Sequence, residues 1–231
     1  MKKYKSIFFD LDHTLWDFER NASETIRELH ADFDLESKGV RDVNYFIANY
    51  IKFNDLLWVE FRQGLIDQET LRLRRFYSTF QVYGLSDPKL IKAFSKSYME
   101  KCPEKGHLFP HTIEVLDYLQ TKYSLHIITN GFKEVQKRKL ASSGLAPYFE
   151  HMITSESAGV RKPHPRIFQF ALRKTESMKK ESIMIGDDLI ADVGGAISSG
   201  WDCVFFNPKK KEHEAPVSYD IACLSELKSI L

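Results

Sequence analysis

Hydrophobic positions form short continuous runs at the start of the chain and in its second half, whereas between them they recur at helical spacing. The run Ser6–Phe9 ends at Asp10, a pattern typical of a strand buried on both faces of a parallel sheet. From about residue 20 to 102 apolar residues recur every three or four positions. A further helix is predicted to begin at Asp87-Pro88, because Asp is a natural N-cap and Pro suits the first helical position. The chain is therefore predicted to open on a central strand that leads into an all-helical block.

After residue 107 the pattern alternates between strands and helices. It predicts strands at 125–129, 151–154, 182–185 and 203–206, and helices at 111–122, 132–143, 165–174 and 189–199. Such alternation favours an α/β fold in which a Rossmann-like parallel sheet carries helices on both faces. The helical block is then an insertion after the first strand. Residues 1–15 and 107–231 are predicted to form the core, and residues 16–106 a cap domain over the carboxyl ends of the strands.

Composition narrows the class of protein. The 231 residues are 43% hydrophobic, and 33 Lys and Arg balance 32 Asp and Glu, so bulk charge does not support binding of polymeric nucleic acid. Three cysteines lie far apart without CxxC spacing, so neither a disulfide framework nor a zinc site is indicated. The apolar run before Asp10 is too short for a signal peptide or a membrane span. A folded cytoplasmic protein that does not bind membranes is expected.

Polar and charged residues follow four of the predicted strands, at the edge where open parallel sheets bind ligands. They are Asp10 and Asp12 after the first strand, Thr129 and Asn130 after the second, Lys162 in the connection after the third, and Asp187, Asp188 and Asp192 after the fourth. Each residue alone has an ordinary explanation as a turn, a helix cap or a solvated surface group. Their shared placement is what indicates a site.

Two carboxylates only two residues apart suggest a particular chemistry. Asp10 and Asp12 project near one point, and their repulsion is costly unless a cation is present or one of them is protonated. Asp187, at the end of another strand, can meet Asp10 across the sheet and complete an oxygen-ligand site for Mg²⁺. Thr129 can offer a hydroxyl to an anion, and Lys162 a positive charge. These residues together predict a site for a phosphate group and a divalent cation.

Four motifs, in order along the chain, carry a resemblance to a known family. They are Asp10-Leu11-Asp12-His13-Thr14-Leu15, Thr129-Asn130-Gly131, Lys162-Pro163, and Gly186-Asp187-Asp188 with Asp192. This set resembles the haloacid dehalogenase superfamily of phosphohydrolases, and the resemblance covers nearly the whole chain. The segment from Asp12 to Phe18, followed by a helical cap of the C1 type, looks like the pyrimidine 5′-nucleotidase branch. His13 stands where most relatives carry Gly.

The resemblance implies a Mg²⁺-dependent phosphomonoesterase that works through an aspartyl-phosphate. Asp10 would attack the phosphoryl group, and Asp12 would act first as acid and then as base. Burial and the negative charge of Asp10 would favour a proton on Asp12, while the metal and Lys162 would oppose it. The family's ligand set implies that Mg²⁺ is held by the Asp10 carboxylate, the Asp12 backbone carbonyl and Asp187.

The remaining residues would bind the phosphate or support the residues that do. By the same resemblance, Thr129, Lys162 and backbone N–H groups that include that of Asn130 would bind the phosphoryl oxygens. Asp192 and Asp188 would orient Lys162 or metal-bound water. The substrate is then a small phosphate monoester rather than a polymer.

Several substrate classes and mechanisms remain open. Pyrimidine nucleoside 5′-monophosphates are favoured, and sugar phosphates or other small metabolites are the alternative. A phosphomutase would keep the same residues but retain the aspartyl-phosphate for return transfer. A dehalogenase needs neither Asp12 nor a metal, so the presence of Asp12 and Asp187 argues against that activity. A binding or regulatory protein on the same fold would not need every expected catalytic position to be occupied.

Overall fold

A computed structural model describes residues 4–231, which divide into two compact units. One unit comprises the chain up to Phe18 together with Gly106–Leu231, and the other comprises Glu19–Lys105. Each unit contains large side chains that are fully buried, such as Phe8 in the first and Phe46 in the second. Each therefore has an apolar core of its own.

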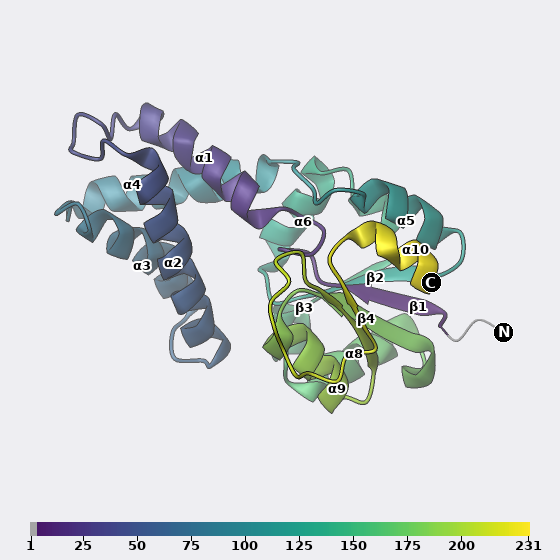
Figure 1. The fold of residues 1–231 in the computed structure, drawn as a ribbon. Coiled ribbons are helices and arrows are strands. Elements are labelled where there is room, and N and C mark those ends of the chain that lie inside the picture. The colour runs from purple at the N-terminus through teal and green to yellow at the C-terminus, as the bar shows by residue number, and fades with distance from the viewer. Residues whose placement is uncertain (1–3) are drawn as a thin grey trace. The chain divides into compact units, whose positions relative to one another are not determined.

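The first unit is built on a parallel sheet (Figure 1). Over residues 4–231 its six strands, in spatial order, are β3 (His151–Thr154), β2 (Ser124–Thr129), β1 (Ser6–Phe9), β4 (Ser182–Gly186), β5 (Asp202–Phe206) and β6 (Tyr219–Ile221). All four residues of β1 are buried, as expected for a central strand. The five predicted strands are confirmed. Strand β6 was not predicted, because it has only three residues, two of them exposed, at the edge of the sheet.

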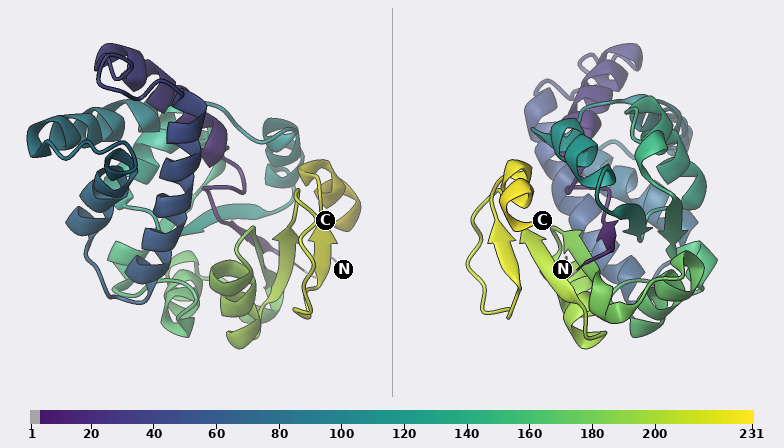
Figure 2. Two further views of the ribbon diagram at one scale, coloured as in Figure 1. Left: turned by 60° about the vertical axis from the view of Figure 1, so that its left-hand side comes forward. Right: turned by 90° about the vertical axis from the view of Figure 1, so that its right-hand side faces the viewer.

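Helices cover both faces of this sheet, which confirms the predicted α/β class (Figures 1 and 2). Helices α5, α6 and α10 lie on one face, and α8 and α9 on the other. The helices of this unit are α5 (Thr112–Gln120), α6 (Lys133–Ser142), α7 (Ser155–Ala158), α8 (Pro165–Thr175), α9 (Gly195–Ser198) and α10 (Leu227–Ile230), with short 3₁₀ turns η2 (Ala146–Tyr148), η3 (Lys179–Glu181) and η5 (Leu224–Glu226).

The prediction of one helix over 189–199 was wrong in detail. The segment begins as a π-helical turn, η4 (Leu189–Gly194), and only Gly195–Ser198 is α-helical. The Val193 amide donates to the Asp188 carbonyl across five residues. π-Turns of this kind often occur at functional sites, and periodicity alone does not distinguish them from an α-helix.

The register of the sheet brings the strand ends together. Phe9 of β1 pairs with Ile127 of β2 and with Ile185 of β4. The Asp10 amide, one residue later, donates to the Ile185 carbonyl over 2.9 Å. The residues that follow β1, β2 and β4 therefore emerge at the same edge of the sheet.

The second unit is helical over its described length. Its elements are α1 (Phe18–Asp32, whose first residue belongs to the other unit), α2 (Val43–Arg62), α3 (Gln68–Gln81), α4 (Pro88–Lys101) and the 3₁₀ turn η1 (Cys102–Glu104). Asp87 caps α4 by accepting from the Lys89 amide, with Pro88 in the first turn, as predicted. Buried aromatic rings such as Phe46, Phe80 and Phe94 pack edge to face with centroids 5.1–5.9 Å apart.

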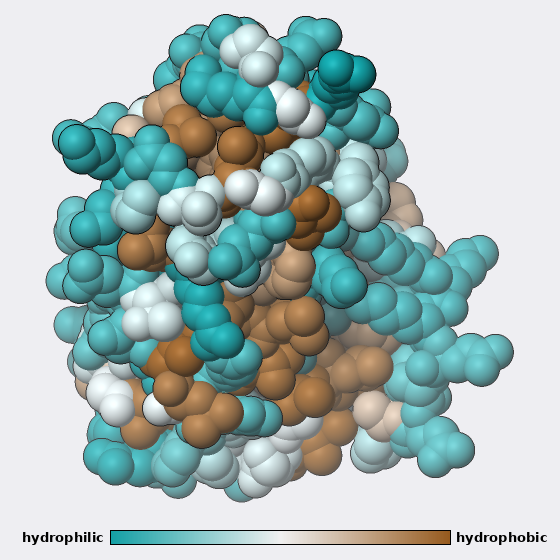
Figure 3. Space-filling view, turned by 90° about the vertical axis from the view of Figure 1, so that its left-hand side faces the viewer, coloured by the Kyte–Doolittle hydropathy of each residue, from teal (hydrophilic) through white to brown (hydrophobic). Residues whose placement is uncertain are grey.

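Several large apolar side chains of the helical unit also reach the surface. Tyr45, Leu56 and Leu65 are each more than half exposed. Figure 3 shows hydrophobic surface, in brown, between hydrophilic surface, in teal, on the side that faces the viewer. Within residues 4–231 no helix has both the length and the apolar character needed to cross a membrane.

A buried histidine lies in the sheet at β2. His126 is 1% exposed, its ring stacks on His151 with centroids 5.5 Å apart, and neither ring nitrogen has a hydrogen-bond partner among residues 4–231. Burial lowers the pKa of His126 to about 4 from its ordinary 6.5, because the charged form loses its hydration. The folded state therefore holds His126 neutral.

This histidine makes stability depend on pH. Unfolded His126 takes up a proton below about 6.5 and folded His126 does so only near 4, so its contribution is complete above pH 6.5 and is lost as the pH falls toward 4. The loss is at most about 3 kcal/mol, at 1.36 kcal/mol per pKa unit. Urea unfolding at several pH values should show a smaller decline between pH 6.5 and 4.5 for His126→Leu than for the wild type. His164→Asn, at an exposed position, is the control, and parallel declines in wild type and His126→Leu would contradict the prediction.

Candidate active site

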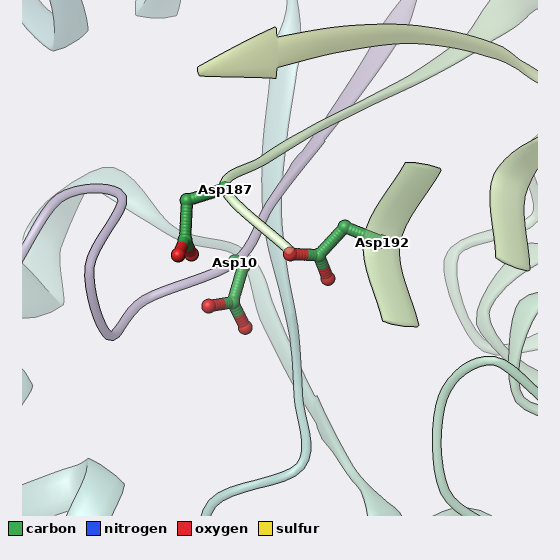
Figure 4. A group of neighbouring side chains, drawn as sticks. All are labelled: Asp10, Asp187 and Asp192. Atoms are coloured by element: carbon green, nitrogen blue, oxygen red, sulfur yellow. The ribbon is translucent and has the colours of Figure 1, made fainter. Parts of the chain in front are cut away.

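Three carboxylates converge at the carboxyl edge of the sheet (Figure 4). Asp10 follows β1, Asp187 follows β4, and Asp192 comes from the π-turn η4. One carboxylate oxygen from each lies within 4.8 Å of the others. The predicted meeting of Asp10 and Asp187 is observed, and Asp192 joins them.

Lys162 lies against this cluster and is 2% exposed. Its ammonium donates to Asp10 Oδ1 at 2.6 Å, to Asp192 Oδ1 at 2.5 Å and to the Ile128 carbonyl at 2.7 Å. A lysine has three protons to donate, so all of them are used by protein oxygens. Lys162 can therefore contact a phosphoryl oxygen only by exchanging one of these bonds, and without substrate it holds Asp10 and Asp192 in place.

The groups around Lys162 are themselves held. Asn130 accepts from the Lys162 amide at 2.8 Å and donates to the Lys162 carbonyl at 3.0 Å, so its side chain binds the lysine backbone. Asp192 Oδ2 accepts from the Asp188 amide at 3.1 Å. Gly186 leaves room for this arrangement, since a Cβ there would lie 2.4 Å from the Asp192 carboxyl carbon.

Asp188 has the ordinary role of a helix cap. Its Oδ1 accepts from the amides of Ile190 and Ala191, each at 2.8 Å. These bonds satisfy N–H groups that the first turn leaves without partners. The backbone amide of Asp188, rather than its side chain, is what reaches Asp192.

Thr129 is prepared to donate a hydrogen bond. Its Oγ1 accepts from the Gly131 amide at 3.0 Å and from Gln136 Nε2 at 2.8 Å. A hydroxyl has two acceptor positions and one proton, so both acceptor positions are occupied. The Thr129 proton remains for an acceptor such as a phosphoryl oxygen.

Asp12 has a different ion-pair partner from Asp10, namely Lys139 of α6. Lys139 Nζ is 2.5 Å from Asp12 Oδ1, and Gln136 Nε2 is 2.9 Å from Asp12 Oδ2. Next to Asp12, His13 adopts a left-handed conformation with φ 63°, which Gly adopts more readily.

Sequence reasoning missed Gln136 and Lys139. Within the predicted helix 132–143 the only signal was that these two residues share a face with the apolar Leu140. An isolated lysine is normally solvated, so its identity gave no reason to bury it.

The two aspartates of the first motif differ in charge environment. Burial raises the pKa of Asp10 to about 7, although Lys162 opposes the shift. Burial also acts to raise the pKa of Asp12, but the Lys139 charge and the hydrogen bonds from Lys139 and Gln136 outweigh it and hold that pKa below its usual range. Burial therefore acts on Asp12 in the expected direction, but the cation that opposes a proton there is Lys139, whereas the sequence pointed to Lys162 and the metal.

The carboxylate cluster carries more negative charge than its lysine neutralises. Burial, followed by the charges of neighbouring carboxylates, raises the pKa of Asp187 well above its ordinary value, and burial also raises that of Asp192 despite Lys162. A divalent cation would remove this cost, and carboxylate oxygens are the donors that Mg²⁺ prefers. The donor set of Asp10 and Asp187 therefore fits Mg²⁺.

Comparison with known proteins identifies similar chains. The haloacid dehalogenase-like hydrolase family matches residues 4–200. The chain is 30% identical to the HAD-hydrolase YfnB of Bacillus subtilis over 100% of its own length and 97% of that protein. It is 30% identical to the pyrimidine 5′-nucleotidase PynA of Streptococcus pneumoniae, over 99% of its length and 95% of that protein.

Two further comparisons extend the similarity. The chain is 27% identical to a glyceraldehyde 3-phosphate phosphatase of Methanothermobacter thermautotrophicus, over 98% of its length and 99% of that protein. A crystal structure of YfnB bound to magnesium superposes with a TM-score of 0.88 at 28% identity, covering 100% of this chain and 99% of that one. The fold of the whole chain is thus shared with a solved structure.

The carboxylate cluster predicts stabilisation by Mg²⁺. Relative to EDTA, Mg²⁺ should raise the Tm of the wild type, by the equivalent of about 2.7 kcal/mol when its concentration is 100 times Kd. Asp187→Asn should lose most of this shift because it removes a charged oxygen ligand, whereas Asp117→Asn, at an exposed position on α5, should keep it. Equal Mg²⁺ shifts for wild type and Asp187→Asn would contradict the assignment.

Proposed function

This chain belongs to the haloacid dehalogenase-like hydrolases, and we propose that it is a phosphomonoesterase acting on pyrimidine nucleoside 5′-monophosphates through an aspartyl-phosphate. The observation that carries the proposal is the buried Asp10–Lys162 pair, with Asp187 and Asp192 beside it, at the carboxyl edge of the sheet. Similarity to the pyrimidine 5′-nucleotidase PynA supports the choice of substrate.

In the first step Asp10 attacks phosphorus, and the bond to the leaving oxygen breaks as the aspartyl-phosphate forms. The Thr129 hydroxyl donates a hydrogen bond to a phosphoryl oxygen. Lys162 offsets part of the negative charge of Asp10 and Asp192. Asp12 passes a proton to the leaving oxygen, and the bound phosphate favours that proton because a nearby negative charge raises the pKa of a carboxyl group.

In the second step Asp12 is the base. Its carboxylate takes a proton from water as the water oxygen attacks the aspartyl-phosphate, so Asp10 is regenerated and phosphate is released. The ion pair with Lys139 keeps the Asp12 carboxylate charged, which is the form that this step requires.

Mg²⁺ fits the same edge of the sheet. Asp10, the Asp12 backbone carbonyl and Asp187 are the groups that would hold it. When bound, the ion supplies positive charge that offsets repulsion between the phosphate and the carboxylates. The magnesium-bound structure of the similar YfnB supports this assignment.

We assign the helical unit, Glu19–Lys105, as the cap domain that selects the leaving group. The crystal structure of YfnB reveals interdomain movement, which supports opening and closing of such a domain here. Sugar phosphates are the alternative substrate class, because the chain is nearly as similar to a glyceraldehyde 3-phosphate phosphatase.

Substitution of the nucleophile tests the mechanism. Asp10→Asn should lower phosphate release at least about 10³-fold, because the amide cannot form the acyl-phosphate. Its Tm should stay near that of the wild type, since the change also removes one of several mutually repelling carboxylates. Asp117→Asn should retain full activity. Activity retained by Asp10→Asn would exclude Asp10 as the nucleophile.

Relative kcat/KM values test the substrate. Phosphate release is measured with dUMP, dTMP, UMP, purine monophosphates and sugar phosphates, each with Mg²⁺ and with EDTA. The best pyrimidine nucleotide should exceed the other classes by about tenfold or more, a difference of about 1.4 kcal/mol in transition-state binding. A leading sugar phosphate would keep the mechanism and replace the substrate. Turnover that requires a bisphosphate activator would instead indicate a phosphomutase.

A further inference from the structure

Two side chains of α6 bind both oxygens of the Asp12 carboxylate. Lys139 Nζ lies 2.5 Å from Oδ1, and Gln136 Nε2 donates to Oδ2 over 2.9 Å. Gln136 and Lys139 are three residues apart on the helix, so they project from one face. Because each oxygen has a donor, the Asp12 carboxylate is restrained against rotation about its Cβ–Cγ bond.

Contacts other than the ion pair with Asp12 also hold the Lys139 side chain in place. It is 5% exposed, which is unusual for a lysine, and its Nζ lies 4.2 Å from the centroid of the Trp16 ring. Trp16 is fully buried, and its backbone forms β-bridges with Asp12 and with Leu108. The ammonium is thus held between an indole face and the carboxylate, and the segment that carries the indole is bridged to Asp12 itself.

The side chain of Gln136 donates its hydrogen bonds in this arrangement, while its own amide oxygen accepts none from the described residues. Its amide nitrogen donates to Asp12 and to Thr129, while its buried Oε1 has no hydrogen-bond partner among residues 4–231. A buried oxygen without a hydrogen-bond partner is energetically unfavourable, so other contacts of Gln136 must favour this placement. A Cβ at Gly131 would lie 2.3 Å from Gln136 Nε2, so the backbone beside it leaves room for this placement.

We propose that Lys139, supported by Gln136, is a positioning residue that aims the Asp12 carboxyl group at the leaving oxygen of the substrate. Lys139 is an ion-pair partner of Asp12 and is not one of the groups assigned to phosphate or Mg²⁺. It therefore acts on proton transfer and not on attack at phosphorus. The inference rests on the proposed phosphatase activity.

Leaving groups of different basicity test this role. Proton donation matters for a nucleoside alkoxide and little for p-nitrophenolate, which departs without a proton. Lys139→Met should lower kcat/KM for the best nucleotide by about 10–100-fold and for p-nitrophenyl phosphate by less than about threefold, with a smaller change in KM than in kcat for the nucleotide. Lys139→Arg should recover most of the nucleotide activity because it restores the charge and the donors.

Two sets of variants separate positioning from folding. Lys137→Met removes an exposed lysine of the same helix and should behave as wild type. In an Asp12→Asn background, Lys139→Met should cause no further loss, since a residue that acts through Asp12 has nothing left to position. If Lys139→Met does not fold, Lys139→Gln, which keeps a donor of similar reach, is measured in the same assays.

Three results would overturn the inference. They are an equal loss with both substrates, an additive loss in the Asp12→Asn background, and unchanged or faster nucleotide turnover in Lys139→Met. Each requires that the wild type releases phosphate. A wild type that releases none from any substrate, with Mg²⁺ present, would overturn the proposed function itself.

Discussion

Lys162 is a cation buried among carboxylates, and its ion pairs hold the candidate site together. Removing an ammonium from water costs several kcal/mol unless good partners replace the solvent, and here Asp10, Asp192 and a backbone carbonyl accept all three of its protons. Two neighbouring features hold Lys162 and its partners in position. Asn130 binds the backbone of Lys162, and the π-turn carries Asp192 to the ammonium. One ammonium does not neutralise the carboxylates that surround it, so the same packing that fixes Asp10 leaves an excess of negative charge that a divalent cation would offset.

A second buried lysine, Lys139, gives Asp12 a different electrostatic environment from that of Asp10. Asp10 and Asp12 are two residues apart, yet burial raises the pKa of Asp10 while Lys139 lowers that of Asp12. Opposite shifts in two neighbouring carboxyl groups are a common basis for assigning them different chemical roles. The two lysines come from different elements, one from the connection before α8 and one from α6, so the distinction arises only when the sheet is assembled.

Similarity to known proteins bears on the reaction more directly than on the substrate. The chain is similar over nearly its whole length both to a pyrimidine 5′-nucleotidase and to a glyceraldehyde 3-phosphate phosphatase. Relatives with different substrates can share one reaction, because a site on a common core performs the chemistry and other surfaces choose the substrate. The buried aromatic core of the helical unit stabilises that unit independently of the substrate that any one relative uses.

The sequence by itself determined the α/β class, the positions of five strands and the helical insertion, because hydrophobic periodicity reports which faces are buried. It also identified Asp10, Asp187, Asp192 and Lys162, since these residues follow strands whose parallel order brings their ends to one edge. Only the tertiary structure decided that helix 189–199 opens as a π-turn, that Lys162 has no proton free, and that Lys139 and Gln136 bind Asp12. These depend on contacts between residues far apart in the chain, and the burial of a lysine is energetically acceptable only where folding supplies its partner.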